Sequence, residues 1–156
     1  MIEKIAKSDV VRCADILYES EIGSRYYPRK ELLVSTLEQS LQSDEIYCYK
    51  DKKGEIQGVI WYQHAGMFNT YPYLHMIAVD NNCRHMGIGK QLLEHFEKES
   101  LQAGANKIRT KAFLLVAHDN EVAQMMYEQA GYEEITEISS LFRIRMDEKL
   151  LYKVVV

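Results

Sequence analysis

Apolar and polar positions follow two different periods along the chain, and these divide it into helices and strands. Four segments carry apolar residues every three or four positions and are predicted to be amphipathic helices: 8–18, 28–41, 88–103 and 120–131. Short runs rich in β-branched and aromatic residues predict strands: 2–6, 45–50, 56–64, 73–79, 107–116, 132–139 and 150–155. The polar segment 21–27 is expected to be a loop. The last helix carries an apolar stripe that is expected to pack in the core: Val122, Met125, Met126 and Ala130.

The order of these elements predicts the fold class. Residues 73–79 are almost wholly apolar, which is typical of a central strand covered on both faces. The helix 88–103 and the strand 107–116 follow, so strand, helix and strand are expected to form a parallel unit with a right-handed crossover. We therefore predict an α/β fold with a mixed, mostly antiparallel sheet, a central parallel βαβ unit and helices on both faces. The chain has 156 residues and no linker, which predicts one domain spanning 1–156.

Composition and charge exclude several classes of protein. Hydrophobic residues make up 47% of the chain and charged residues 27%, which is typical of a globular protein. The formal net charge of −4 provides no field for a polynucleotide or an anionic membrane, so neither partner is expected. No apolar run reaches the ~18 residues of a membrane span, and the first residues lack a signal peptide's apolar core, so a cytoplasmic location is expected. The three cysteines lack metal-ligand spacing and are expected to be reduced thiols: Cys13, Cys48 and Cys83.

The clearest local motif lies between the apolar strand and the helix that follows it. Its residues are Arg84, His85, Met86, Gly87, Ile88, Gly89 and Lys90. Glycines allow positive φ and close approach of a ligand, and the free N–H groups at a helix N-terminus attract an anion. The motif therefore predicts a pyrophosphate site, with a tight turn that holds no ligand as the alternative. A dinucleotide-binding Rossmann motif is disfavoured, because only one Gly-x-Gly is present and a basic residue precedes it.

Three motifs in a fixed order resemble the GCN5-related N-acetyltransferase (GNAT) superfamily over residues 72–132. They are Leu74-His75-Met76-Ile77-Ala78-Val79, then Arg84-x-x-Gly87-x-Gly89-Lys90, then Asn120-x-x-Ala123-x-x-x-Tyr127-x-x-x-Gly131-Tyr132. The resemblance implies an acetyl-CoA-dependent N-acetyltransferase whose sheet is splayed beside the central strand to bind acyl-CoA, with no metal. It implies that Ile77, Ala78 and Val79 bind the pantetheine arm and Arg84 through Lys90 the pyrophosphate. Asn120 and Tyr127 would then lie at the arm and the thiol.

The same resemblance suggests a catalytic pair. An alkylamine is largely protonated at pH 7, so attack on a thioester needs a base, and the departing thiolate needs an acid. Tyr127 matches the family's tyrosine, and a phenol with a pKa of about 10 keeps a proton to donate. His75 is the candidate base, because its strand resembles the histidine-bearing strand of arylalkylamine N-acetyltransferases and alternation places it on one face with Ile77 and Val79. The alternatives are a hydrogen-bonded core role for His75, with His118 or a water chain as the base.

The acceptor side is less defined in the sequence. By resemblance, the segment between the first two helices and the last strands build the acceptor pocket. Its mouth would carry Glu21, Ser24, Arg25, Tyr26 and Tyr27, and His118 is a further candidate. Mixed charges and two tyrosines fit a primary amine of a small molecule or a peptide. Two alternatives are a CoA-binding sensor without turnover and an acetylating toxin that acts on charged tRNA, and the latter would need a basic surface. A homodimer is left open.

Overall fold

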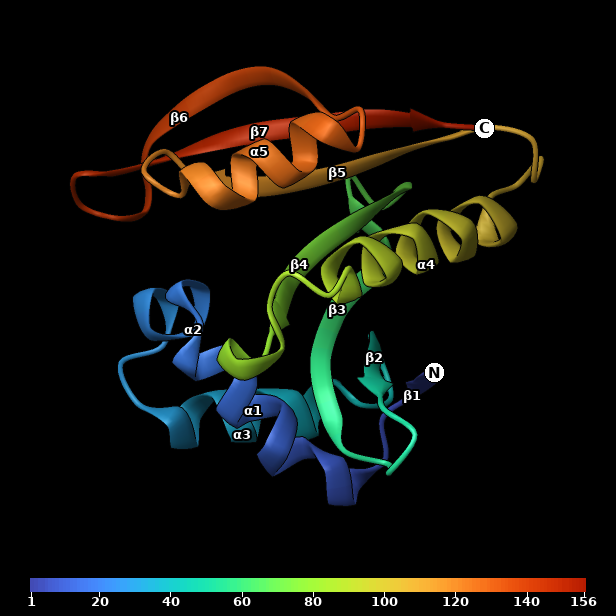
Figure 1. Ribbon diagram of the computed structural model, residues 1–156. Helices are drawn as coiled ribbons and strands as arrows, with labels where there is room; N and C mark the ends of the chain where they lie inside the picture. The colour runs from blue at the N-terminus through green and yellow to red at the C-terminus, as the bar shows by residue number, and fades with distance from the viewer.

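The structure is a computed structural model that describes residues 1–156, except for the side chain of Ile22. Within these residues seven strands form one mixed sheet in the order β1-β2-β3-β4-β5-β7-β6 (Figure 1). The strands are β1 (Ile2–Lys4), β2 (Glu45–Lys50), β3 (Ile56–Met67), β4 (Tyr71–Val79), β5 (Thr110–Ala117), β6 (Glu133–Arg143) and β7 (Met146–Val155). The helices are α1 (Val10–Glu19), α2 (Glu21–Tyr26), α3 (Lys30–Ser40), α4 (Ile88–Ala103) and α5 (Glu121–Gln129), with 3-10 turns η1 (Lys7–Asp9) and η2 (Asn81–Cys83).

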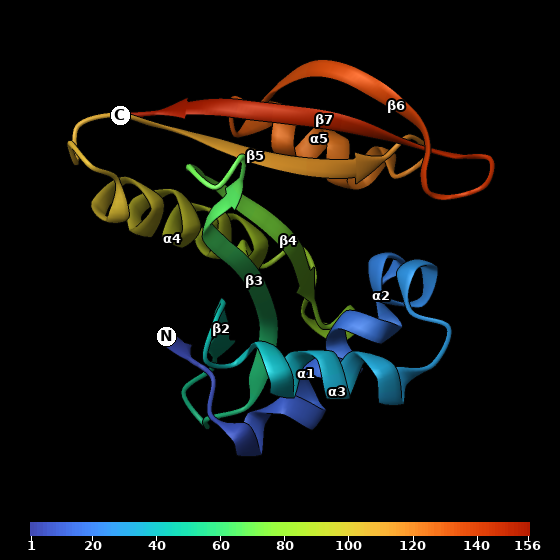
Figure 2. The same ribbon diagram turned by 180° about the vertical axis from the view of Figure 1, so that it is seen from behind.

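The helices lie on both faces of the sheet, which confirms the predicted fold class. One face of the β1–β4 half packs against α1 and α3, and the opposite face packs against α4 (Figures 1 and 2). α5 lies over β5 and β7 on the same face as α4. Two hydrophobic clusters result, one on each side of the sheet, and each buries the apolar face of its helices. Among the described residues, no helix is both long and apolar enough to cross a bilayer.

The central parallel pair is short, and the sheet divides beside it. β4 and β5 pair only through Tyr73 with Phe113 and Leu74 with Leu114. Beyond Leu74 the two strands diverge, so the β1–β4 and β5–β7 halves lie at a wide angle in Figure 2. The peptide groups of β4 that face this gap have no strand partner there among the described residues, and such groups require hydrogen-bond partners from elsewhere. The expected splay is therefore present.

A β-bulge at His75 interrupts the alternation of side chains along β4. Tyr62 pairs with Leu74 and Trp61 with Met76, which leaves His75 as an extra residue without a partner on β3. Side chains after the bulge consequently change faces. Ile77 packs in the cluster beneath α4, whereas Met76 packs with α1 and α3. The prediction that His75 shares a face with Ile77 and Val79 is wrong, because regular alternation does not pass through the extra residue.

Segment 21–27 is not a loop, because residues 21–26 form the short helix α2. Ser20 caps it by accepting a hydrogen bond from the Gly23 amide. Gly23 is required where α2 crosses the end of α1, since a Cβ atom there would lie 2.0 Å from the Leu17 carbonyl oxygen. The helix therefore depends on a close tertiary contact and not on a periodic apolar pattern, which explains why it was missed.

The predicted core stripe of the last helix is also wrong in part. Val122 and Met125 of α5 are 80% and 60% exposed. The face of α5 that packs on the sheet instead carries residues at helical spacing: Ala123, Met126, Tyr127 and Ala130. Tyr127 is the buried residue of this face. The helix therefore presents Tyr127 inward, at the gap between the two halves of the sheet.

Candidate active site

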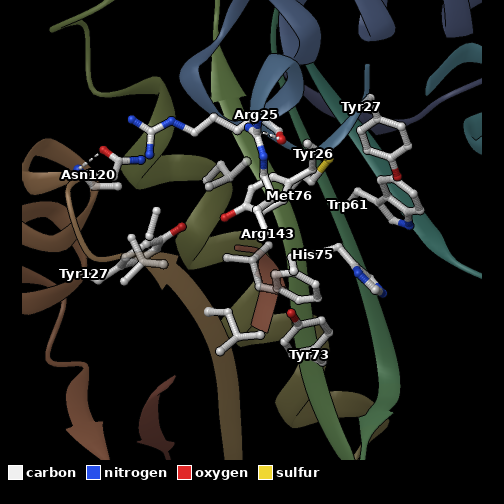
Figure 3. A pocket seen from close by; sticks show the side chains of 17 residues that line it. Arg25, Tyr26, Tyr27, Trp61, Tyr73, His75, Met76, Asn120, Tyr127 and Arg143 are labelled. Carbon is white, nitrogen blue, oxygen red and sulfur yellow. Dashed lines mark hydrogen bonds between the residues drawn. The ribbon is translucent and has the colours of Figure 1, made fainter. Parts of the chain in front are cut away.

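A cavity of about 420 Å³ lies where β4 and β5 diverge. One wall comes from Tyr73–Ile77 of β4, and the opposite wall comes from Leu115–Ala117 of β5. α5 and α2 contribute the other side chains, together with Trp61 of β3 and the end of β6. The lining residues outside β4 and β5 are Arg25, Tyr26, Tyr27, Trp61, Asn120, Ala123, Tyr127, Phe142 and Arg143. In Figure 3, Tyr127 and Asn120 lie on one side of β4, whereas Tyr27, Trp61 and His75 lie on the other side.

Tyr127 reaches the cavity from α5, and its phenol points into it (Figure 3). The residue is 3% exposed, and its ring packs edge-on against Tyr132 at 5.8 Å between centroids. Burial raises the pKa of the Tyr127 hydroxyl, so this group is protonated at neutral pH. Asn120 caps α5 by accepting a hydrogen bond from the Ala123 amide at 3.2 Å, and it also lines the cavity. The predicted acid and the predicted arm-binding residue therefore lie in one site.

His75 lies on the other side of β4, beside two aromatic rings. Its imidazole is 5.2 Å from the Trp61 ring and 4.8 Å from the Tyr73 ring, between centroids. His75 is exposed to solvent and also lines the cavity. The surrounding rings nevertheless lower the pKa of His75, because a partly desolvated imidazolium is disfavoured, and the nearby Asp44 charge opposes this. The imidazole is therefore neutral at pH 7 and able to accept a proton.

The α2 segment supplies some of the predicted acceptor residues but not all. Arg25, Tyr26 and Tyr27 line the cavity. Glu21 and Ser24 are exposed outside it, and Glu21 lies 3.8 Å from the Arg25 guanidinium. Arg25 also forms an ion pair with Asp119, which raises the pKa of Arg25 and joins α2 to the turn before α5. Within the described side chains, this pairing leaves Arg25 with its charge already compensated.

His118 does not line the cavity. It follows β5 in an exposed turn, and its Nδ1 lies 2.5 Å from Glu137 Oε1 of β6. Its backbone carbonyl accepts a hydrogen bond from the Gln124 side chain at 2.7 Å. His118 therefore contacts β6 and α5, and the structure does not place it with the other candidate acceptor residues.

The glycine-rich loop lies outside the cavity, at the N-terminus of α4. Gly87 is the N-cap with a φ of +77°, and His85 has a φ of +64°. No side chain caps this helix, and a Cβ atom on Gly87 would meet nothing within 4 Å. The first amides of α4 therefore face open space, as an anion site requires. Arg84 and Lys90 are exposed beside this end of the helix, and Lys90 lies 3.8 Å from Glu94.

One buried carboxylate was missed by the sequence reasoning. Glu148 of β7 is 0% exposed and accepts a hydrogen bond from the Tyr26 hydroxyl. Burial raises its pKa, while the Tyr26 hydrogen bond and the Arg25 charge lower it. In the sequence Glu148 stands between Asp147 and Lys149, so nothing distinguishes it from an exposed charged residue. Its importance depends on the pairing of β7 with β5, which places it opposite Ala117 of the cavity wall.

A family comparison fits this geometry. The model of the acetyltransferase (GNAT) family matches residues 14–132. The chain belongs to the GNAT acetyltransferase family. Its members are acetyl-CoA-dependent N-acetyltransferases that acetylate amine acceptors, which confirms the expected enzyme class. No curated protein matches the chain in sequence.

Solved structures of other acetyltransferases share the fold at low identity. A variant of the spermidine N-acetyltransferase SpeG from Vibrio cholerae is 15% identical, with a TM-score of 0.77 over 99% of this chain and 92% of that one. A ribosomal-protein-alanine N-acetyltransferase from Brucella melitensis is 16% identical, with a TM-score of 0.78 over 99% of each chain. Ard1 from Thermoplasma volcanium is 18% identical, with a TM-score of 0.78 over 100% of this chain and 97% of that one. These structures support the GNAT fold and leave the acceptor of this enzyme open.

Proposed function

We propose that this GNAT enzyme transfers an acetyl group from acetyl-CoA directly to the primary amine of a small molecule or a peptide. The observation that carries the proposal is the cavity between β4 and β5, because it is bounded by unpaired strand edges and receives Tyr127 from α5. Amide groups of an extended pantetheine arm would complete the unpaired edge of β4 at Ile77, Ala78 and Val79. The side chains of Ile77 and Ala78 are buried, so this binding would use the backbone.

The pyrophosphate of acetyl-CoA fits the loop at the start of α4. Its free amides and the helix dipole favour an anion, and Gly87 provides the open approach. Arg84, His85, Met86, Ile88, Gly89 and Lys90 complete this segment. Ile88 is buried and anchors the helix, whereas Arg84 and Lys90 supply exposed positive charge near the phosphates. The proposal therefore places phosphate recognition mostly on backbone groups.

Catalysis in this proposal uses groups on the two faces of the sheet. The acceptor nitrogen attacks the thioester carbon, the carbon–sulfur bond breaks, and Tyr127 donates its proton to the departing thiolate. His75, neutral at pH 7, accepts the proton that the attacking nitrogen loses, directly or through water. Tyr127 lies on the α5 side of the cavity, and His75 lies on the other side of β4 beside Trp61 (Figure 3). The arrangement separates the leaving group from the attacking amine.

The acceptor would enter on the α2 side. Arg25, Tyr26 and Tyr27 line this side of the cavity, and Trp61 adds a further aromatic surface. Such walls suit an amine with an apolar or aromatic body. Glu21, Ser24 and His118 lie outside the cavity, where only a larger acceptor such as a peptide would contact them.

A screen of amines and peptides with acetyl-CoA tests this function. Released thiol is measured for alkylamines, arylalkylamines and peptides with free N-termini, each with and without enzyme. Turnover with any of them supports the proposal and excludes the sensor alternative. Binding of acetyl-CoA without turnover on any amine would favour the sensor, and turnover only on charged tRNA would favour the toxin alternative.

The His75→Gln variant is expected to lose the acidic limb of the kcat/KM profile. The pKa of His75 is lowered, so the wild-type base stays neutral at pH 7 and becomes protonated only below the ordinary histidine value of about 6.5. Activity therefore falls as the pH decreases through this lowered pKa, and a glutamine cannot show that titration. The measurement is kcat/KM between pH 5 and pH 9 with a fixed amine.

His95→Gln is the matched control for this test. Burial also lowers the pKa of His95, but this residue lies on α4 against Tyr47 and does not line the cavity. The control is expected to keep the acidic limb. If His75→Gln retains both the limb and full activity, His75 is a packing residue, and the base is a water chain or another group.

A further inference from the structure

Glu148 is a buried carboxylate that has only part of its hydrogen bonding satisfied. One oxygen, Oε1, accepts from the Tyr26 hydroxyl, whereas Oε2 is buried without any partner among the described residues. A buried ionised carboxylate is costly unless its charge is paired. Glu148 also lies beyond residues 14–132, the part of the chain that the family model matches.

No cation of the described side chains forms an ion pair with Glu148, although the Arg25 charge acts on it and lowers its pKa. Arg143, the other cation that lines the cavity, donates to the Arg25 backbone carbonyl. The nearest basic side chain on α2, Arg25, is engaged by Asp119 with 3.3 Å between Nη2 and Oδ2. Lys149, the next residue on β7, points to Glu134 of β6 at 4.0 Å. The Glu148 carboxylate can therefore stabilise one further positive charge.

Tyr26 connects this charge to the cavity. Its hydroxyl donates to Glu148, and the same residue lines the cavity, where its phenol is seen in Figure 3. A phenol oxygen that donates one hydrogen bond can still accept another. Burial and the Glu148 hydrogen bond raise the pKa of Tyr26, so it stays protonated and keeps this donor direction. The influence of Glu148 also reaches across the cavity, because burial and this charge raise the pKa of Tyr73 to about 12.

We propose that Tyr26 and Glu148 form an ammonium site, in which the Tyr26 oxygen accepts a hydrogen bond from the protonated acceptor amine and the Glu148 carboxylate beneath it supplies the charge. This inference rests on the proposed function and names its acceptor class: an alkylammonium ion with an apolar or aromatic body. Tyr26 is the contacting residue, and Glu148 is a positioning residue that acts through it. Tyr27 and Trp61 offer aromatic surface beside the site for the body of the acceptor.

Binding of a matched pair of probes tests the ammonium site without any turnover. The probes are 2-phenylethylamine, which is protonated at pH 7, and its neutral isostere 2-phenylethanol, each titrated at millimolar concentration and followed by calorimetry or protein NMR. Wild type is expected to bind the amine more tightly than the alcohol. Glu148→Gln keeps an acceptor for the Tyr26 hydroxyl but removes the charge. It should weaken amine binding roughly 10- to 100-fold and leave alcohol binding within about twofold.

Two further variants separate the site from a packing effect. Tyr26→Phe should weaken binding of the amine and leave binding of the alcohol unchanged. Its effect on amine binding should not add to that of Glu148→Gln, because the two residues act as one unit. Glu134→Gln removes one negative charge from the exposed neighbouring strand β6 and should leave the affinity for both probes unchanged. The proposal is overturned if wild type shows no preference for the amine, or if Glu148→Gln weakens both probes equally. Because no acetyl-CoA is used, failure of acetyl transfer would be seen separately in the amine screen.

Discussion

Replacing Tyr127 by phenylalanine is expected to lower kcat by about 100-fold or more while the dissociation constant of acetyl-CoA changes by no more than about twofold. The hydroxyl is the only group removed, and it points into the cavity from α5. Its raised pKa keeps the proton that the thiolate needs, so the loss appears in the chemical step and not in binding. Pre-steady-state and steady-state kinetics with one amine, together with calorimetry of acetyl-CoA, measure the two effects.

Tyr132→Phe provides the control for this variant. Tyr132 forms the other half of the same edge-on ring pair, and its hydroxyl is also buried, but it does not line the cavity. The control should keep kcat within about twofold, because it removes a buried hydroxyl at a distance from the thiol. A Tyr127→Phe variant that is as active as this control would exclude Tyr127 as the acid.

Gly87→Val is expected to weaken acetyl-CoA binding by about 100-fold or more. A valine at a φ of +77° is strained, and relief of that strain would turn the first amides of α4 away from the phosphates. A valine side chain would also occupy the space in front of the helix, where a Cβ atom on Gly87 now meets no other atom within 4 Å. Several charge-assisted hydrogen bonds would be lost together. Calorimetry with acetyl-CoA measures the affinity, and a thermal melt measures the stability.

Gly54→Val separates backbone strain from phosphate binding. Gly54 lies in the turn between β2 and β3 with a φ of +84°, and a Cβ atom there also meets nothing within 4 Å. The two variants should therefore lose similar stability, by about 1–2 kcal/mol. Only Gly87→Val should lose affinity for acetyl-CoA. Equal affinity for acetyl-CoA in the two variants would show that the α4 loop does not hold the phosphates.

Local sequence pattern was sufficient for several elements that position the site. The predicted bounds of α4 (Ile88–Ala103) and β2 (Glu45–Lys50) agree with the structure. Both elements have a strong period and clear end signals, since Gly87 precedes α4 and Gly104 follows it. The glycine-rich loop and the start of the last helix near Asn120 follow from the same short-range rules, whereas the role of Tyr127 came from the family resemblance and its burial from the structure. These features depend on residues within a few positions of one another.

The acceptor side could not be predicted in the same way, because it is assembled from distant segments. Tyr26 of α2 meets Glu148 of β7, and these two residues are separated by 122 positions. α2 itself forms where Gly23 allows it to approach α1, and no periodic pattern predicts this contact. Phe142 and Arg143 reach the cavity from the end of β6. The family resemblance indicated the last strands as a whole but neither of these residues. Long-range packing therefore selects the acceptor residues.

By itself, the sequence determined the order of most elements, because helix and strand periods are local properties of the chain. Its motifs gave the resemblance to the GNAT family, and that resemblance supplied the acid candidate Tyr127. Only the tertiary structure decided on which face each candidate lies. The bulge opposite Trp61 and Tyr62 moves His75 away from Ile77, and pairing with Ala117 brings Glu148 beside the cavity. The physical reason is that strand register is set by the partner strand and by the packing of both faces, and a shift of one residue reverses every side chain that follows.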